Sequence, residues 1–488
     1  MAGSSEIEVT RPNRKELAIR LGVVQREAAD LGIPSVVIIE GLDGSGKGRL
    51  LNKLILEIDA RAYDIYSTHA SDLPSRDYPL LWRMWNHTPV DGKLQFFDRS
   101  AYYLALDAWA DGNLDAEGFD RYMEDLRQFE KQLADNGTLL LKILLTVSKK
   151  EQAKRFRKYE KNPKTAWRVT SKDWRRNRQY REYLKQARSM MEATGQPFAP
   201  WKEIRTDDLK EAAIELYETV IAAFETAVAA RKKVAARKQP ARRWVSYKGP
   251  DHLAQVDLTG RLERDHYKKL LKKRQKEIND LAHQIHEHRI PVVMAYCGWD
   301  AAGKGGCIKR LLQGVDPRSF SVVPIGAPTK LELSHHYLWR FWRVLPPRGK
   351  ITILDRSWYG RVLVERVEAL CSNKEWQRAY DEINVMERHL ADFGTVVIKF
   401  WLHIDQDTQL ERFQARAANP FKQWKITDED WRNRKKFPRY EQAVNEMIER
   451  TDTPYAPWTI VPANCKMTAR IQTLDTFIGA VKSALKGR

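Results

Sequence analysis

Apolar and polar positions follow the same order in two long stretches of the chain. Each stretch opens with a charged, amphipathic segment, residues 14–31 or 265–288, which predicts a helix. A proline then leads into a short β-branched run at residues 35–40 or 292–297, which predicts a buried strand. A Gly-rich loop, a basic helix and further strands and helices follow in the same order in both stretches. Strands that alternate with helices are typical of a parallel sheet with helices on both faces.

A constant offset relates the two stretches. Gly41 corresponds to Gly298, and 298 − 41 = 257 residues. The same offset joins Trp82 to Trp339, Asp98 to Asp355, Asp135 to Asp392, Trp174 to Trp431 and Trp201 to Trp458. We therefore expect a tandem duplication: one domain over residues 1–230, a basic linker over 231–247 and a second domain over 248–488.

Composition narrows the class of protein. The 488 residues carry a formal net charge of +20, which indicates an anionic partner. An apolar fraction of 43% with 16 Trp argues against disorder. The four Cys form no Cys-x-x-Cys pair, the first residues do not resemble a secretory signal, and no apolar run is long enough to span a membrane. We expect a cytoplasmic protein without a membrane partner, and we interpret the basic linker as a solvated segment and expect no nucleic-acid partner.

The Gly-rich loop occurs twice, as residues 41–48 and 298–305, and each copy contains Gly-Lys-Gly between a strand and a helix. Backbone N–H groups at a helix N-terminus bind anions, glycines let a phosphate approach closely, and the lysine adds a charge. This is the context of a Walker A phosphate-binding loop. An accidental Gly-rich turn is the alternative, and two copies in the same context argue against it.

Both loops lack one functional group. Walker A loops carry Ser or Thr after the lysine, and its hydroxyl holds Mg²⁺; here Gly48 and Gly305 occupy that position. A metal would need other ligands. The loop aspartates Asp43 and Asp300 and the strand-end aspartates Asp98 and Asp355 are the candidates, since a strand-end carboxylate beside such a loop is a usual metal ligand.

The second stretch resembles the polyphosphate kinase 2 family. The similarity rests on Gly298-Trp-Asp-Ala-Ala-Gly-Lys-Gly-Gly306, Gly326-Ala-Pro-Thr329, Tyr337-Leu-Trp-Arg-Phe-Trp342 and Asp355-Arg-Ser-Trp-Tyr-Gly-Arg361 with Glu365-Arg366, and it continues to Ala469-Arg470. The first stretch resembles the family more weakly, and two fused copies resemble its polyphosphate:AMP phosphotransferase subgroup. The resemblance implies a duplicated α/β fold: a P-loop kinase-like parallel sheet with flanking helices and a helical lid. It also implies transfer of a phosphoryl group from inorganic polyphosphate to AMP, giving ADP, with Mg²⁺ or Mn²⁺.

The resemblance also implies roles for residues of the second stretch. Asp300, Lys304, Asp355 and Arg356 would be catalytic, and Asp300 and Asp355 would hold the metal. Phosphate and polyphosphate would contact Gly303, Lys304, Gly305, Arg361, Arg366, Arg412, Arg416 and Lys425, the last three on the lid. The nucleotide would contact Asp300, Pro328, Thr329 and Glu365. Each lid cation alone could equally belong to a solvated basic helix.

The first stretch keeps Asp43, Lys47, Asp98 and Arg99 but has Leu104, Ala108 and Trp109 at the positions of Arg361, Glu365 and Arg366. We therefore expect catalysis in the second stretch and a degenerate first copy. A homo-oligomer is compatible with the sequence.

Three alternatives stay open at this level. The acceptor could be ADP, GMP or GDP within the same family. The first loop resembles that of thymidylate kinases, which suggests an ATP-dependent nucleoside monophosphate kinase, although Gly48 and Gly305 lack the hydroxyl that an ATP·Mg²⁺ site uses. A non-catalytic polyanion binder would explain the net charge but not the preserved Asp300, Lys304 and Asp355.

Overall fold

A computed structural model describes residues 13–68, 77–236, 242–421, 423 and 426–487. The chain forms two compact units, and the main division falls inside the predicted linker 231–247. Each unit has its own parallel five-stranded sheet with flanking helices, so the predicted fold class and the tandem duplication are confirmed.

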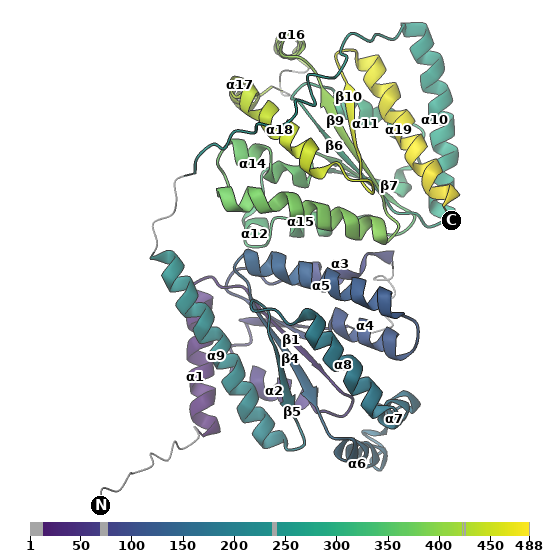
Figure 1. The fold of residues 1–488 in the computed structure, drawn as a ribbon. Coiled ribbons are helices and arrows are strands. Elements are labelled where there is room, and N and C mark those ends of the chain that lie inside the picture. Colours follow the sequence, from purple (N-terminus) through teal and green to yellow (C-terminus); the bar gives the residue numbers. More distant parts are fainter. Residues whose placement is uncertain (1–12, 69–76, 237–241, 422, 424–425, 488) are drawn as a thin grey trace, which may run out of the picture. The chain divides into compact units, whose positions relative to one another are not determined.

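The first sheet has the strand order β2-β3-β1-β4-β5, and every neighbouring pair is parallel (Figure 1). Its strands are β1 (Ser35–Gly41), β2 (Tyr63–Ser67), β3 (Leu94–Asp98), β4 (Leu139–Thr146) and β5 (Trp201–Arg205). The helices are α1 (Arg14–Asp30), α2 (Lys47–Ile55), α3 (Leu80–Asn86), α4 (Ala101–Ala110), α5 (Ala116–Asp135), α6 (Lys149–Glu160), η2 (Ala166–Arg168), α7 (Ser171–Arg178), α8 (Tyr180–Thr194) and α9 (Leu209–Ala235). Non-consecutive neighbours are joined by helical crossovers, as parallel strands require.

The second sheet repeats this arrangement in the order β7-β8-β6-β9-β10. Its strands are β6 (Val292–Gly298), β7 (Phe320–Pro324), β8 (Ile351–Asp355), β9 (Val396–His403) and β10 (Trp458–Pro462). The helices are α10 (Arg264–Glu287), α11 (Lys304–Leu312), η3 (Pro317–Ser319), α12 (Lys330–Leu333), α13 (Trp339–Trp342), η4 (Trp358–Arg361), α14 (Val364–Val367), α15 (Asn373–Asp392), α16 (Gln406–Ala417), α17 (Asp428–Lys435), α18 (Phe437–Thr451) and α19 (Lys466–Lys486).

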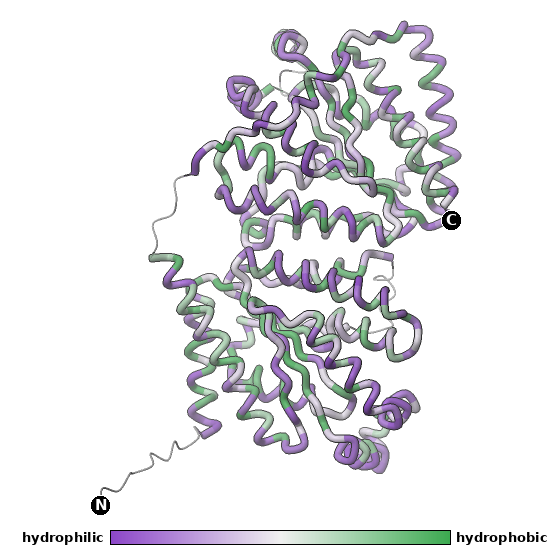
Figure 2. The backbone as a smooth tube through the Cα atoms, viewed as in Figure 1, coloured by the Kyte–Doolittle hydropathy of each residue, from purple (hydrophilic) through white to green (hydrophobic). Residues whose placement is uncertain are grey.

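Burial explains why these segments form sheets. The central strands are apolar along almost their whole length, and they lie between layers of helices with apolar inner faces (Figure 2). In the first unit α1 and α2 pack on α9, while α4 and α5 pack on α8. In the second unit α10 and α11 pack on α19, while α14 and α15 pack on α18.

Strand register brings the two predicted aspartates to one edge of the second sheet. Tyr296 of β6 lies opposite Asp355 of β8, and Gly298 lies opposite Leu402 of β9. A Cβ on Gly298 would meet the Leu402 carbonyl oxygen at 2.6 Å, so only glycine fits where the loop leaves the sheet. Ligands of parallel sheets bind at this carboxyl edge, where the order of strands reverses.

Each sheet also contains a buried lysine that the sequence pattern did not explain. Lys399 of β9 donates to Glu387 at 2.8 Å, to the Thr451 carbonyl at 2.7 Å and to the Tyr359 hydroxyl at 3.0 Å. Trp358 also donates to Glu387, at 2.9 Å. The pair therefore fixes the first residues of η4, the segment that follows the strand-end Asp355.

The first unit has the same arrangement, made by the same residue types 257 positions earlier in the chain. Lys142 donates to Glu130 at 2.6 Å and to the Thr194 carbonyl at 2.8 Å, and Tyr102 donates to Glu130 at 2.8 Å. The persistence of this pair in both copies indicates that it supports the fold itself. Across the described residues, every helix is too short or too polar to cross a membrane.

Candidate active site

The loop between β6 and α11 has the backbone that a phosphate-binding loop requires. Gly298, Ala301 and Gly303 have positive φ angles of 146°, 64° and 111°. The N-terminal N–H groups of α11 carry no side-chain cap, so they are available to an anion. Lys304 donates to the carbonyls of Gly298 at 2.8 Å and Trp299 at 3.2 Å, so its ammonium group lies along the loop. Burial lowers the pKa of Lys304, and nearby Asp300 and Asp355 oppose this shift.

The side chain of Arg412, on α16, contacts the backbone of this loop. Its guanidinium donates to the carbonyls of Ala301 at 3.0 Å and Ala302 at 3.2 Å, and to those of Ala463 and Asn464 at 2.8 Å each. The side chain is buried, and burial lowers its pKa. The sequence predicted that Arg412 belongs to the lid, but its guanidinium donates to four backbone carbonyls, two of them in the loop. Arg412 therefore orients the loop.

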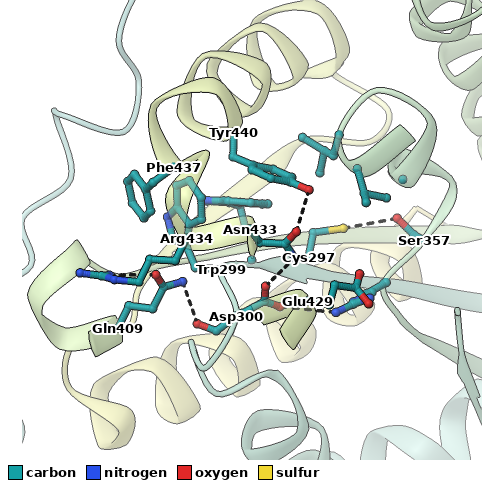
Figure 3. Close-up of a pocket in the computed structure, with 16 residues that line it drawn as sticks. Cys297, Trp299, Asp300, Ser357, Gln409, Glu429, Asn433, Arg434, Phe437 and Tyr440 are labelled. Atoms are coloured by element: carbon teal, nitrogen blue, oxygen red, sulfur yellow. Dashed lines mark hydrogen bonds and ion pairs between the residues drawn. The ribbon is translucent and has the colours of Figure 1, made fainter. Parts of the chain in front are cut away.

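Asp300 lies between two donors at the mouth of a cavity (Figure 3). Arg356 approaches its carboxylate at 3.4 Å, and Asn433 of α17 donates to the other oxygen at 3.1 Å. Asn433 in turn accepts from the Tyr440 hydroxyl at 3.3 Å. Arg356 has a φ of 68°, unusual for a residue with a side chain, and its side chain is 52% exposed. A positive charge is therefore presented to solvent directly beside the loop carboxylate.

Aromatic packing supports the same wall of the cavity. Trp299 stacks on Phe437 with ring centres 3.9 Å apart, and its indole N–H donates to Nδ1 of His403 at 3.0 Å. The imidazole is therefore neutral with its proton on Nε2, and burial lowers the pKa of His403 to about 4. Because Trp299 belongs to the loop and Phe437 begins α18, this stack joins the loop to the helices above it.

The cavity measures about 100 Å³, and it is the hollow that these loop and helix residues enclose. Its lining comprises Cys297, Gly298, Trp299, Asp300, Arg356, Ser357, Gly360, Leu363, Val364, Trp401, Gln409, Glu429, Asn433, Arg434, Phe437 and Tyr440. Sequence reasoning identified Asp300 and Arg356 in this set but missed Asn433, Phe437 and Tyr440. A comparison of positions 257 residues apart could have identified Asn433. The matching residue of the first copy is Arg176, so the two copies differ in charge at this position.

Other predicted residues lie around this centre rather than in it. Arg361 pairs with Glu365 at 3.0 Å and lies over the Tyr337 ring, and burial raises the pKa of Glu365. Arg366 is buried, where it pairs with Glu446 at 2.8 Å and donates to the Tyr380 hydroxyl at 2.9 Å.

The remaining predicted residues are peripheral in this structure. Arg416 is half-buried on α16, and Pro328 and Thr329 are exposed in the segment between β7 and α12. Lys425 lies outside the described residues. Their predicted contacts with nucleotide and polyphosphate stay predictions.

The donor set at the loop fits Mg²⁺. Asp300 and Asp355 both act on Lys304 electrostatically, so both carboxylates lie at the same end of the sheet. Mg²⁺ is usually held by one or two carboxylates together with substrate phosphates and water. Within the described part of the chain, no group of three or more His, Cys, Asp or Glu side chains could hold a metal by itself. The site therefore suits a metal that arrives with phosphate ligands.

Glycine after the loop lysine is not required by the fold. A Cβ at Gly305 or at Gly48 would meet no other atom within 4 Å, and neither residue has a positive φ angle. A serine hydroxyl would therefore fit in both copies. The open space in front of these glycines lies where a phosphate would approach the helix N-terminus.

The corresponding site of the first unit is filled by its own side chains. Arg176, which replaces Asn433, pairs with Asp43 at 3.0 Å and also with Asp107, which replaces Val364. Tyr103 replaces Gly360, and the Arg99 guanidinium lies 4.9 Å from the centre of its ring.

A further carboxylate lies beside the first loop. Glu40 replaces Cys297, is buried, and accepts from the backbone and the hydroxyl of Ser100 at 2.7 and 2.8 Å. Burial raises the pKa of Glu40, and Lys47 opposes the shift. In the first unit the loop carboxylate is therefore paired with an arginine, and an additional buried carboxylate lies near the loop lysine.

Known proteins share both the sequence and the fold. The family model described as polyphosphate kinase 2 matches residues 5–232 and again residues 261–488. The chain is 36% identical to the polyphosphate:AMP phosphotransferase of Pseudomonas aeruginosa over 453 residues, covering 93% of this chain and 91% of that one. It is also 36% identical to the polyphosphate:AMP phosphotransferase of Acinetobacter johnsonii over 454 residues, covering 92% and 91%.

A crystal structure of a polyphosphate kinase 2 from Pseudomonas aeruginosa PA01 superimposes with a TM-score of 0.86 at 34% identity, over 97% of this chain and 96% of that one. These matches and the paired parallel sheets define a duplicated P-loop kinase fold. The chain belongs to the polyphosphate kinase 2 family, and the expected place among its two-domain members is confirmed.

Proposed function

We propose that this protein is a polyphosphate:AMP phosphotransferase, which transfers a phosphoryl group from inorganic polyphosphate to AMP and produces ADP. Relatives that carry this name match nearly the whole chain. The structural observation that supports the proposal is Asp300, held between Arg356 and Asn433 beside Lys304 and the α11 N-terminus. Transfer of a phosphoryl group between two phosphorylated molecules needs groups that neutralise and position phosphates. This site offers a carboxylate, two cations and the N–H groups of a helix N-terminus close together.

The second unit would perform the reaction by positioning and by charge neutralisation. The loop N–H groups and Lys304 would hold the transferred phosphoryl group, and the exposed Arg356 would contact its outer oxygens. Asp300 would orient the acceptor phosphate. Asp300 and Asp355 would hold Mg²⁺, which when bound neutralises charge on the phosphate oxygens.

Helices α17 and α18 would exclude water from this centre. Phe437 covers the loop residue Trp299, and Asn433 contacts Asp300 directly. Water is a competing acceptor, so its exclusion protects the phosphoryl group.

We also propose that the protein works in the reducing environment of the cytoplasm, because its four cysteines form no disulfide.

The second unit alone would be active. In the first unit Arg176, Asp107 and Glu40 pair the groups that would otherwise meet phosphate. Lys47 therefore serves as an internal control for Lys304, because it has the same loop position and an equivalent fold.

The test is ADP formation by the purified protein from AMP, long-chain polyphosphate and Mg²⁺, without ATP. We expect Lys304→Ala to reduce activity by at least about 100-fold, a loss typical of removing a transition-state charge contact. Lys47→Ala should leave the rate within about twofold of wild type, since Lys47 lies in the filled site.

Three outcomes would contradict this proposal. ADP that forms only when ATP replaces polyphosphate would identify a nucleoside monophosphate kinase. Product from ADP or GMP at higher kcat/KM than from AMP would assign another acceptor within the same family. Equal losses in Lys47→Ala and Lys304→Ala would place catalysis in both units.

A further inference from the structure

The first unit carries an excess of positive charge that its own site does not use. Residues 149–188 contain sixteen Lys and Arg against four Asp and Glu, a net charge of +12. The matching residues 406–445 contain nine against six, a net charge of +3. The rest of residues 1–230 carries a net charge of −11, so positive charge is concentrated in this one segment of the first unit. A basic substrate site kept from a common ancestor does not explain this charge, because the matching segment of the second unit, where we place catalysis, is much less basic.

This segment forms a continuous helical region of the first unit. Helix α6 packs against η2 and α7, and α7 packs against α8. Figure 2 shows α6 and α7 almost entirely in the hydrophilic colour. On α6 and just after it, Lys150, Lys154, Arg157, Lys158 and Lys161 follow the spacing of one helix face. Their charges thus lie in a row rather than around the helix.

Most of these cations lack a carboxylate partner. Within the described residues, nine exposed cationic side chains of this segment have neither an ion pair nor a side-chain hydrogen bond: Lys150, Arg157, Lys158, Lys161, Lys164, Arg168, Arg178, Arg181 and Lys185. Three of the four acidic residues of the segment are already engaged: Glu151 accepts from Lys154 and Arg155, Glu160 from the indole N–H of Trp174, and Asp173 from the backbone and hydroxyl of Thr170. Repulsion among unpaired like charges destabilises the free protein, and an anionic ligand would relieve it. We call these nine cations the basic surface.

We propose that the basic surface of the first unit binds long-chain inorganic polyphosphate, separately from the loop site of the second unit. This proposal rests on the proposed function, which makes polyphosphate the donor. A polyphosphate chain bears about one negative charge per phosphate, so a row of cations matches it better than a single pocket does. One large aromatic side chain of the segment, Trp167, is clearly exposed, at 72%, whereas single-stranded nucleic acids stack successive bases on several aromatic rings.

The expected consequence is a dependence on chain length. A polyphosphate held by the first unit stays at high effective concentration for a reaction on the same molecule. Tripolyphosphate is too short to contact more than a few of these cations at once, so it gains little from the surface. The basic surface should therefore lower KM for long chains only, and it should leave kcat unchanged because no reacting group belongs to it.

The experiment compares two fourfold variants with the same loss of charge. One replaces Arg157, Lys158, Lys161 and Lys164 of the basic surface with serine. The control replaces Lys269, Lys272, Lys273 and Lys276 of α10, which are also exposed and unpaired among the described residues, with serine. Both proteins are assayed with long-chain polyphosphate and with tripolyphosphate, over a range of salt concentrations.

In the basic-surface variant we expect KM for long-chain polyphosphate to rise about tenfold, while KM for tripolyphosphate and kcat change less than about twofold. The slope of log KM against log salt concentration should fall by about 3, since each lost contact with a flexible polyanion removes about 0.7. The α10 variant should resemble wild type in both respects. An equal change in both variants, or an unchanged KM for long chains, would overturn the proposal.

A direct binding measurement separates this inference from the proposed function. Lys304→Ala protein is titrated with fluorescently labelled long-chain polyphosphate, with and without the four basic-surface substitutions. Loss of binding only when the surface is altered supports the proposal even if wild type makes no ADP. Competition by a single-stranded oligonucleotide at equal concentration of phosphate would instead identify a nucleic-acid surface and overturn it.

Discussion

At the scale of single residues, the two copies differ most at positions 433 and 176. Asn433 adds no positive charge beside Asp300, because its neutral amide donates a hydrogen bond to the carboxylate. Arg176 neutralises Asp43 and reaches Asp107 as well. The same backbone thus supports an open site or a filled one, depending on a few inward-facing side chains.

Asn433→Arg should reproduce the first copy in the second. The guanidinium would pair with Asp300 as Arg176 pairs with Asp43, so we expect activity to fall by about 100-fold while the melting temperature is kept. Steady-state kinetics and thermal melting measure both quantities. Asn113→Arg, the same change at an exposed position in the first unit, serves as the control. Wild-type activity in Asn433→Arg would show that Asp300 has no role in the reaction.

His403 should make stability depend on pH. Its pKa is about 4 in the folded protein, below the ordinary value of 6.5, because burial disfavours the charged ring. Between these values the unfolded chain binds the extra proton, so the free energy of unfolding falls as pH decreases from 6.5 to 4, by roughly 3 kcal/mol. Above pH 6.5 this contribution is constant.

Denaturant titrations at several pH values measure this effect. His403→Gln keeps an acceptor for the Trp299 N–H and does not titrate, so its stability should vary less with pH than that of wild type. His283→Gln, an exposed residue of α10, should retain the wild-type slope. Identical slopes in wild type and His403→Gln would show that the imidazole is not held neutral.

At the scale of helices and strands, much of the structure could be predicted from the sequence. The predicted helix at residues 14–31 matches α1, and the predicted strand at 292–297 matches β6 to within one residue. The period of the apolar positions and the turn residues identify such helices and strands. This works because burial of one face of an element determines where its apolar residues lie. The order of strands could not be predicted, since it depends on contacts between segments far apart in the chain.

The site was harder to predict than the fold for a related reason. Motifs identify Lys304 and Asp300, because backbone geometry at a helix N-terminus requires particular residues there. The surroundings of Arg412 and Arg366 follow from tertiary packing, and an arginine in a basic helix has the same sequence signal whether it is buried or exposed. Only the carbonyls around Arg412 reveal that it orients the loop.

The buried lysine of β9 should be essential for stability. Lys399→Met would leave the Glu387 carboxylate buried without a cation, which costs about 3–5 kcal/mol. Chemical denaturation measures the loss. Lys131→Met breaks an exposed pair with Asp135 and should cost less than about 1 kcal/mol. Similar small losses in both variants would indicate that water or rearrangement satisfies Glu387.

At the scale of the whole molecule, duplication has separated two tasks that one domain usually combines. The second unit keeps an accessible loop carboxylate and an open cavity. The first keeps the fold, pairs its loop carboxylate with Arg176 and concentrates a net charge of +12 in residues 149–188. Each copy therefore has the same strand order but a different distribution of charge, and the offset of 257 residues makes every difference directly comparable.

The ion pairs of Arg176 have a consequence for motion. In the first unit, α7 is attached to α4 and the loop through Arg176, Lys172 and Arg175, which contact Asp43, Asp107 and Asp111. In the second unit, α17 has fewer contacts of this kind among the described residues: the amide of Asn433 donates to Asp300 of the loop, and Arg432 pairs with Glu368 at 3.8 Å. Fewer contacts mean a smaller free-energy difference between attached and detached states, so α17 should detach more often than α7. On the proposed function, the copy that admits and releases substrates thus has the helix that detaches more readily, while the matching helix of the other copy stays attached.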